Sequence, residues 1–212
     1  PMNTNMTEKK LPCLLIGQGI PNYKEITPTE INKQIPYLIE ILNNEYSELE
    51  NNLIKKISSQ ESIVWDEIML PLNQLSEKLR WSWGAVCHLN GVQNSPELRE
   101  AHAKQQPEII RFCNRLGQSK AIYKALSLLK TQSSEYLDEI QKRILDKELL
   151  SMKHRGVGLD ETKQKEFNSD SERLAKLSTT FSNNVLDATK EWSLLLTEQS
   201  QVDGLPLRAL EI

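Results

Sequence analysis

The sequence is poor in glycine, aromatic residues and cysteine, and each shortage narrows the choice of fold. Glycine accounts for 8 of 212 residues and aromatics for 6%, while Leu, Ile, Glu, Lys, Gln and Asn are plentiful. This mixture favours helices over many short strands. Cys13, Cys87 and Cys113 are odd in number and widely separated, which suits reduced cytosolic thiols better than a disulfide framework. We therefore expect an all-α fold and a cytoplasmic location.

The sequence also lacks an excess of basic charge and a long hydrophobic run. A net charge of −3 leaves little of the phosphate attraction that drives nucleic-acid binding. No segment approaches the run of about 20 apolar residues that spans a bilayer. Leu11–Ile16, interrupted by Pro12, falls short of the apolar core of a signal peptide. We expect neither nucleic acid nor a membrane as a partner.

What the sequence does contain is a succession of apolar patterns with helical spacing. Thr27-Pro28 starts the first, in which Thr27 can cap the helix and Glu30 can reach back to complete a capping box. Apolar residues then recur at three- and four-residue steps: Ile31, Ile35, Leu38, Ile39, Leu42, Tyr46, Leu49 and Leu53. This spacing predicts a long amphipathic helix.

Five further helices are predicted by the same spacing. They cover about residues 65–91, 95–116, 121–129, 137–152 and 160–192, and the last carries a stripe from Phe167 to Trp192. Pro36, Pro71 and Pro107 are expected to kink, delay or split their helices. Six helices with short joints predict a bundle-like array, and no internal repeat of fixed period indicates a solenoid.

The two ends of the chain differ from this helical pattern. We expect a flexible N-terminal segment at residues 1–19 and a helical domain at residues 20–192. Residues 193–212 are expected to be the truncated start of a following region. Within it, residues 194–197 are a possible short strand, and Asp203–Pro206 is a turn before a helix start at Leu207.

The sequence contains no assembled set of catalytic or metal-binding residues. His88, His102 and His154 are too far apart to form an H-E-x-x-H pair, and adjacent Cys87 and His88 cannot both face one metal from a helix. Gly17–Asn22 lacks the third glycine and the Lys-Ser/Thr of a phosphate-binding loop. We therefore assign no residue of this chain a catalytic or metal-binding role, and its substrate-binding residues stay unknown.

The tryptophans leave two interpretations open. Trp65, Trp81 and Trp83 could line a ligand groove, although aromatic residues on helices more often pack in a core. Trp81 lies off its helix's apolar stripe and is either exposed or in contact with another domain.

Four stretches of the sequence carry a resemblance. They are Ile20–Pro28, Cys87–Arg99, Gly156–Leu159 and Phe181–Thr189. In this order they resemble the N-terminal region of the M3 family of zinc oligopeptidases, within it the oligopeptidase A and thimet oligopeptidase group. The resemblance covers residues 20 to 212. After Pro28, relatives often have an acidic residue and a His where this chain has Thr29 and Glu30, and Gly91 stands where Ser is commoner.

The resemblance implies a helical N-terminal domain that forms one wall of a deep channel and restricts access to short peptides. Its partner is the catalytic domain of the same polypeptide. The family's zinc is held by two His of an H-E-x-x-H helix and a downstream Glu, with the motif's Glu as general base. None of these positions exists in this chain. The resemblance implies that the intact parent is a zinc metallo-oligopeptidase and that this segment binds no cofactor and is inactive alone.

Asn183, Asn184 and Asp187 are candidate domain-junction residues, because a mid-helix Asn-Asn pair is unfavourable unless its amides find partners. Alternatively, they face water. Two further hypotheses for the whole chain stay open. One is a free-standing helical module that binds a protein or peptide in a groove. The other is a metal-dependent enzyme assembled from the scattered His and Cys.

Overall fold

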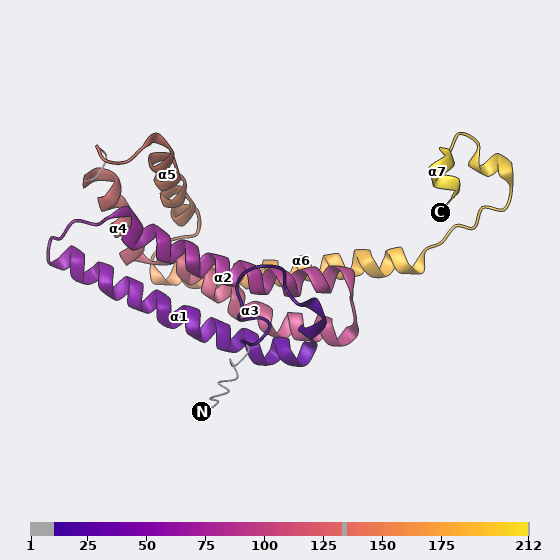
Figure 1. Cartoon of the computed structure of the whole chain (residues 1–212), viewed down its shortest axis with the longest axis horizontal. Coiled ribbons are helices and arrows are strands. Elements are labelled where there is room, and N and C mark those ends of the chain that lie inside the picture. Colours follow the sequence, from indigo (N-terminus) through magenta and orange to yellow (C-terminus); the bar gives the residue numbers. More distant parts are fainter. Residues whose placement is uncertain (1–10, 133–134, 212) are drawn as a thin grey trace, which may run out of the picture. The chain divides into compact units, whose positions relative to one another are not determined.

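A computed structural model describes residues 11–132 and 135–211, and its helices confirm the all-α prediction (Figure 1). The α-helices of these residues are α1 (Pro28–Ser58), α2 (Trp65–Val92), α3 (Pro96–Gln118), α4 (Lys120–Gln132), α5 (Glu139–His154), α6 (Glu161–Glu191) and α7 (Leu207–Leu210). Two 3₁₀ turns, Tyr23–Glu25 and Gln199–Val202, complete the regular structure. By its contacts the chain divides into two compact units, one up to Arg173 and one from Leu174.

The predicted short strand at residues 194–197 is not formed. These residues have no regular structure, and no other strand occurs among the described residues. A strand needs a neighbour to accept and donate its backbone hydrogen bonds. Alternation and composition alone therefore do not make one here.

The core of the first unit is built around the apolar stripe of α1. All eight stripe residues predicted from Ile31 to Leu53 are buried. Helix α1 packs against α2, α3 and α4, and α4 packs against α5. Burying one such Leu or Ile side chain contributes about 1.5–3 kcal/mol. The stripe of α1 therefore organises the unit.

The predicted cap at Thr27 is formed, and α3 and α6 are capped in the same way at their starts. The Glu30 amide donates to Thr27 Oγ1 at 3.2 Å, the Leu98 amide to Ser95 Oγ at 3.2 Å, and the Lys163 amide to Asp160 Oδ1 at 2.9 Å. The second half of the predicted capping box is wrong, because the Glu30 carboxylate accepts a hydrogen bond from Gln34 Nε2 instead.

The prolines do not interrupt their helices. Helix α2 begins six residues before Pro71, and α1 and α3 run through Pro36 and Pro107 without a break. An interior proline costs about 3 kcal/mol. Each proline has buried apolar residues on both sides of it in the same helix, and this burial exceeds the local cost.

Part of the N-terminal segment predicted to be flexible packs onto the helices. Residues 1–10 lie outside the described residues, but Cys13 and Leu14 are buried. The Leu14 amide donates to Gln34 Oε1 at 2.7 Å, and Ser82 Oγ donates to the Leu14 carbonyl. Gln34 and Ser82 thus attach this segment to α1 and α2.

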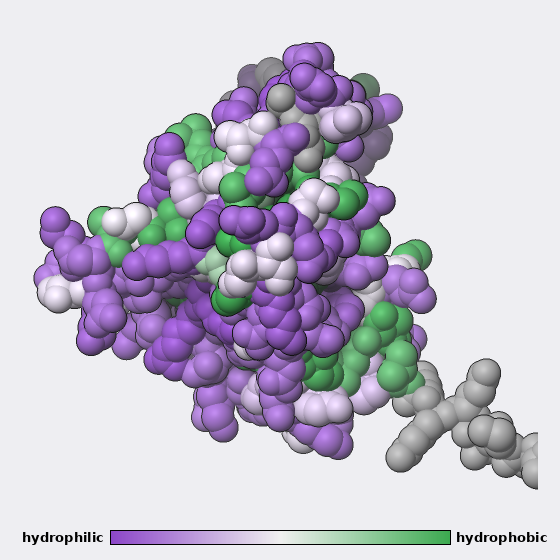
Figure 2. Space-filling model, turned by 90° about the vertical axis from the view of Figure 1, so that its left-hand side faces the viewer, coloured by the Kyte–Doolittle hydropathy of each residue, from purple (hydrophilic) through white to green (hydrophobic). Residues whose placement is uncertain are grey.

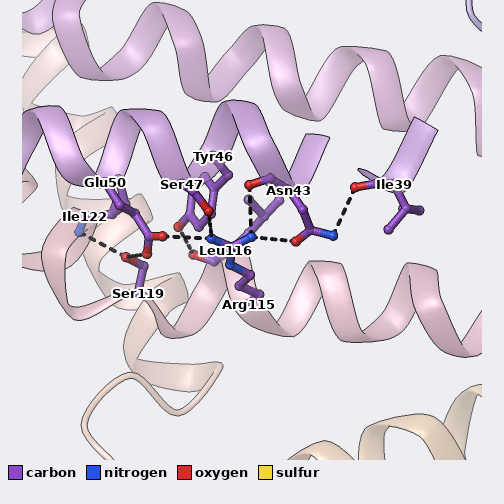
Figure 3. Close-up of polar contacts among 9 residues, drawn as sticks. All are labelled: Ile39, Asn43, Tyr46, Ser47, Glu50, Arg115, Leu116, Ser119 and Ile122. Carbon is purple, nitrogen blue, oxygen red and sulfur yellow. Dashed lines mark hydrogen bonds and ion pairs between the residues drawn. The ribbon is translucent and has the colours of Figure 1, made fainter. Parts of the chain in front are cut away.

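Arg115 on α3 joins α1 through a cluster of polar contacts (Figure 3). Its guanidinium donates to Asn43 Oδ1 at 2.6 Å, Ser47 Oγ at 2.7 Å and Glu50 Oε2 at 3.0 Å. It also lies 5.1 Å from the ring centroid of Tyr46, whose hydroxyl donates to the Leu116 carbonyl. Burial raises the pKa of Tyr46. Charge-assisted bonds of this kind fix the register of α1 on α3.

Candidate functional site: the exposed apolar face of helix α6

The first part of α6 is attached to the first unit by polar contacts. Gln164 Nε2 donates to the Gly156 carbonyl, and Gln118 Nε2 donates to Asn168 Oδ1 at 2.8 Å. Arg111 on α3 donates to both carboxylate oxygens of Glu172, at 2.9 and 3.1 Å, and this carboxylate raises the pKa of Arg111. No residue of α6 is buried.

From Leu174 onward the apolar stripe predicted for this helix is exposed. Leu174, Leu177, Phe181 and Val185 recur at three- and four-residue steps, and their side chains are between 50% and 70% exposed. We call these four residues the α6 stripe. At about 100° per residue they lie on one face of the helix. Proteins rarely leave such a row of large apolar side chains in water without a partner to cover it.

Exposed apolar residues continue after the helix ends. Trp192 is 71% exposed, and Leu194, Leu195 and Leu196 follow it in irregular structure. The sequence had suggested a strand for these leucines. Three consecutive exposed leucines without regular structure are compatible with a contact surface.

The candidate junction residues lie around α6 rather than together on its apolar stripe. Asn183 and Asp187, one turn apart, are half-buried and lie on the side opposite to the α6 stripe, whereas Asn184 lies near its margin and is exposed. The structure therefore places two of the three on one face. The helix presents a polar face and an apolar face over the same turns.

The histidines and cysteines are not arranged as a catalytic centre. His102 Nε2 lies 3.6 Å from Cys87 Sγ, and Trp83 stacks on the His102 ring with centroids 4.7 Å apart. Burial lowers the pKa of His102, and local desolvation raises the pKa of the Cys87 thiol to about 11, although Cys87 as a whole residue is exposed. Both groups are thus held neutral, the opposite of the thiolate and imidazolium that a nucleophilic pair needs.

The other titratable candidates lie apart from this pair. The ring of His88 lies against that of Tyr23, with centroids 5.4 Å apart, and His154 is exposed at the end of α5. Among residues 11–132 and 135–211, no three His, Cys, Asp or Glu side chains lie close enough to hold a metal ion. The described residues therefore do not fit the zinc that the family resemblance implies.

The tryptophans do not form a ligand groove. Trp65 and Trp83 pack against the core, as the simpler of the two interpretations held. Trp81, which lies off the stripe, donates its indole N–H to the Gly19 carbonyl at 2.8 Å. Its partner is thus a loop near the N-terminus.

One face of the molecule is mainly polar. In the view of Figure 2, hydrophilic residues dominate the face, and hydrophobic ones form separate patches. Several charged helix residues are paired, among them Lys78 with Glu45 and Lys130 with Asp146. None of the helices in the described part of the chain is long and apolar enough to cross a membrane.

A helical unit followed by a long helix with an uncovered apolar face is typical of a domain that packs against another part of a protein. Comparison with known proteins also indicates a domain of a larger protein. The N-terminal domain family of neurolysin and thimet oligopeptidase matches residues 35–164. The chain therefore belongs to this family.

Three relatives extend the match to most of the chain. Oligopeptidase A of Haemophilus influenzae is 35% identical over 200 residues, which are 93% of this chain and 28% of that protein. Two Arabidopsis thaliana proteins are each 34% identical over 199 residues: an organellar oligopeptidase A, chloroplastic/mitochondrial, and a probable cytosolic oligopeptidase A. These 199 residues are 93% of this chain, but 24% and 27% of those proteins. The chain thus spans about a quarter of the length of these relatives.

Proposed function

We propose that this chain is the N-terminal helical domain of a zinc-dependent oligopeptidase that hydrolyses short peptides. In this proposal the helical domain restricts substrate access and supports the catalytic domain of the same polypeptide. The catalytic centre lies in that other domain, and zinc is bound there. Residues 20–192 form the domain, residues 193–212 begin the following region, and the enzyme acts in the cytoplasm.

The observation that carries the proposal is the exposed α6 stripe in a chain that matches about a quarter of its relatives' length. Four large apolar side chains on one face of a helix would be covered if the catalytic domain packed there. Removing each from water would contribute about 1–2 kcal/mol at its present exposure. This surface would then become interior in the complete polypeptide.

The candidate junction residues have a defined place in this proposal. Asn183 and Asp187 face away from the α6 stripe and would bond backbone groups of a loop on the other side of the helix. Asn184, near the margin, would bond at the edge of the apolar contact. Side-chain amides that satisfy neighbouring backbone would offset the poor helix propensity of this segment.

In this proposal the catalytic domain, and not this chain, supplies the zinc ligands. When bound in the catalytic domain, zinc would supply an activated water for peptide hydrolysis. The residues of this chain would act on substrate only by limiting which peptides enter.

The proposal is tested on the natural polypeptide read past Ile212. We expect an H-E-x-x-H motif downstream, stoichiometric zinc in the purified longer protein, and cleavage of short quenched peptides in preference to folded proteins. The 212 residues alone should neither bind stoichiometric zinc nor cleave the peptides. Zinc or peptidase activity in the 212-residue chain after removal of host peptidases would contradict the proposal.

The role of the α6 stripe is tested by adjacent substitutions in that longer protein. Phe181→Asp places a charge on the stripe, whereas Thr180→Asp places the same charge on an exposed residue of another face. We expect the first to reduce peptidase activity about tenfold or more by separating the domains, because a charge would have to be buried in the contact. Equal losses of activity in the two variants would show that the α6 stripe is not part of the contact with the catalytic domain.

A second candidate function is a free-standing helical module that binds a peptide or partner helix on the same stripe. The exposed apolar face is compatible with this role. A natural stop codon directly after Ile212 would favour the module, while a downstream zinc motif would favour the peptidase domain.

A further inference from the structure

A pocket of about 290 Å³ lies where the start of α4, the end of α5 and the turn between α5 and α6 meet. It belongs entirely to the first unit and is separate from the α6 stripe. Its lining consists of Lys120, Tyr123, Lys153, Val157, Gly158 and Leu159. The turn that contributes half of this lining is one of the four stretches that resemble the peptidase family, and the proposed function gives the pocket no role.

The floor of the pocket is apolar and fixed by packing. Val157 is buried, and Tyr123 packs against the core while still reaching the pocket. Gly156 adopts a φ of +91°, and a Cβ there would lie 2.9 Å from Leu159 Cδ1. The turn therefore needs glycine to bring Leu159 to this position.

The volume limits what the floor can hold. Pockets for small molecules and cofactors are usually about 300–1,000 Å³. A pocket of about 290 Å³ lies at the small end of this range and has room for one bulky apolar side chain.

The rim of the pocket carries two unpaired positive charges. Lys120 and Lys153 are exposed, and within the described residues the ammonium group of neither makes an ion pair or a hydrogen bond. The lining contains no acidic residue. Lysines nearby behave differently: Lys130 pairs with Asp146 at 2.5 Å and Lys142 with Glu139 at 2.9 Å. The positive rim is thus a local feature of a chain whose net charge is −3.

We propose that this pocket binds an acidic peptide segment. One bulky apolar side chain of the peptide fills the pocket against Val157 and Leu159. Asp or Glu residues on either side of it pair with Lys120 and Lys153, which come from two different helices. Charge complementarity selects a peptide with carboxylates on both flanks, because a single anionic group would satisfy one lysine and leave the other unpaired. The proposal does not depend on the peptidase assignment.

The test uses fluorescence anisotropy with the 212-residue chain and labelled pentapeptides. Gly-Glu-Leu-Glu-Gly carries both features, Gly-Gln-Leu-Gln-Gly lacks the charges, and Gly-Glu-Ala-Glu-Gly lacks the bulky side chain. We expect the first to bind best and to weaken about tenfold in the Lys120→Ala/Lys153→Ala double variant, about two- to fivefold per ion pair. Its binding should also weaken in 0.5 M salt, which screens exposed charges.

Lys124→Ala is the matched control, because Lys124 is an exposed lysine on α4 outside the lining. It should leave binding unchanged. A second variant, Lys120→Glu/Lys153→Glu, should lose the acidic peptide and gain Gly-Lys-Leu-Lys-Gly, which a variant damaged in folding would not do. Equal binding of the glutamine peptide, an equal loss in Lys124→Ala, or displacement of the peptide by decanoate at matched concentration would overturn the proposal.

Discussion

Helices α1 and α6 have the same length, 31 residues each, and both carry an apolar stripe at helical spacing, yet their surroundings are opposite. Nine residues of α1 are buried and none of α6 is. The spacing of apolar residues predicts that a helix has an apolar face, but it does not predict what covers that face. The apolar residues of α1 therefore stabilise the first unit, whereas those of the α6 stripe are available to a partner.

Hydrogen exchange should show the largest difference between the two helices. Amides of residues 38–53 are covered by three helices and should exchange only through global unfolding, at a cost of about 5 kcal/mol or more. Amides of residues 176–191 should exchange through local fraying, at least about 100 times faster, because no buried apolar contact holds that part of α6. Equal protection in the 212-residue chain would show that the α6 stripe is already covered.

Large-to-small substitutions should reproduce this contrast in the free energy of unfolding. Leu42 is fully buried, so Leu42→Ala should cost about 3 kcal/mol in transfer and cavity terms. Phe181→Ala removes a larger side chain that is 70% exposed and should change stability by less than about 0.5 kcal/mol. Urea unfolding monitored by circular dichroism measures both. A cost above 2 kcal/mol for Phe181→Ala would place this residue in a core.

The sequence predicted the fold where an apolar pattern and its partner lie in the same chain. The stripe of α1, the cap at Thr27 and the approximate bounds of the other long helices could be predicted, because each depends on neighbouring residues or on helical spacing. Polar contacts between residues far apart in the sequence could not be predicted. Neither the contact of Arg115 with α1 nor the pairing of Trp81 with Gly19 follows from local spacing.

The candidate site was predictable only in part, for the same reason. The stripe from Leu174 to Val185 was identified as apolar, but nothing in its periodicity distinguished an exposed face from a buried one. The Asn183, Asn184 and Asp187 junction stays a prediction, since their partners would lie outside the described residues. In α5, predicted from apolar spacing over residues 137–152, Leu145 and Met152 are buried but Ile140 is 69% exposed.

Two arginines one helical turn apart on α3 allow the same contrast to be tested for polar contacts. Arg115 binds Asn43, Ser47 and Glu50 of α1 in a half-buried setting, whereas Arg111 binds Glu172 of α6 at the surface. Arg115→Met should cost about 2 kcal/mol, because it leaves partly buried acceptors without a donor. Arg111→Met should cost about 0.5 kcal/mol or less. Similar costs would mean that α6 is held as firmly as α1.

The smallest expected effect is a pH dependence confined to the first unit. His102 on α3 is buried beneath Trp83, and burial lowers its pKa in the folded chain. The unfolded chain, with an ordinary His pKa of about 6.5, binds the proton more readily, so stability should fall as the pH drops below about 6.5. The slope attributable to His102 is at most about 1.4 kcal/mol per pH unit.

Substitution separates this effect from other titrations. His102→Gln should remove that part of the slope whatever its absolute stability, while His154→Gln, at an exposed position, should retain it. Urea unfolding between pH 5 and 7.5 measures the slopes, and exchange of the 176–191 amides over the same range should follow only the intrinsic pH dependence of amide exchange. If the free energy of unfolding of the His102→Gln protein kept the same slope against pH, groups other than His102 would cause the pH dependence. If amide protection in α6 changed in step with His102, the second half of α6 would be coupled to the core, and the contrast with α1 would be one of degree.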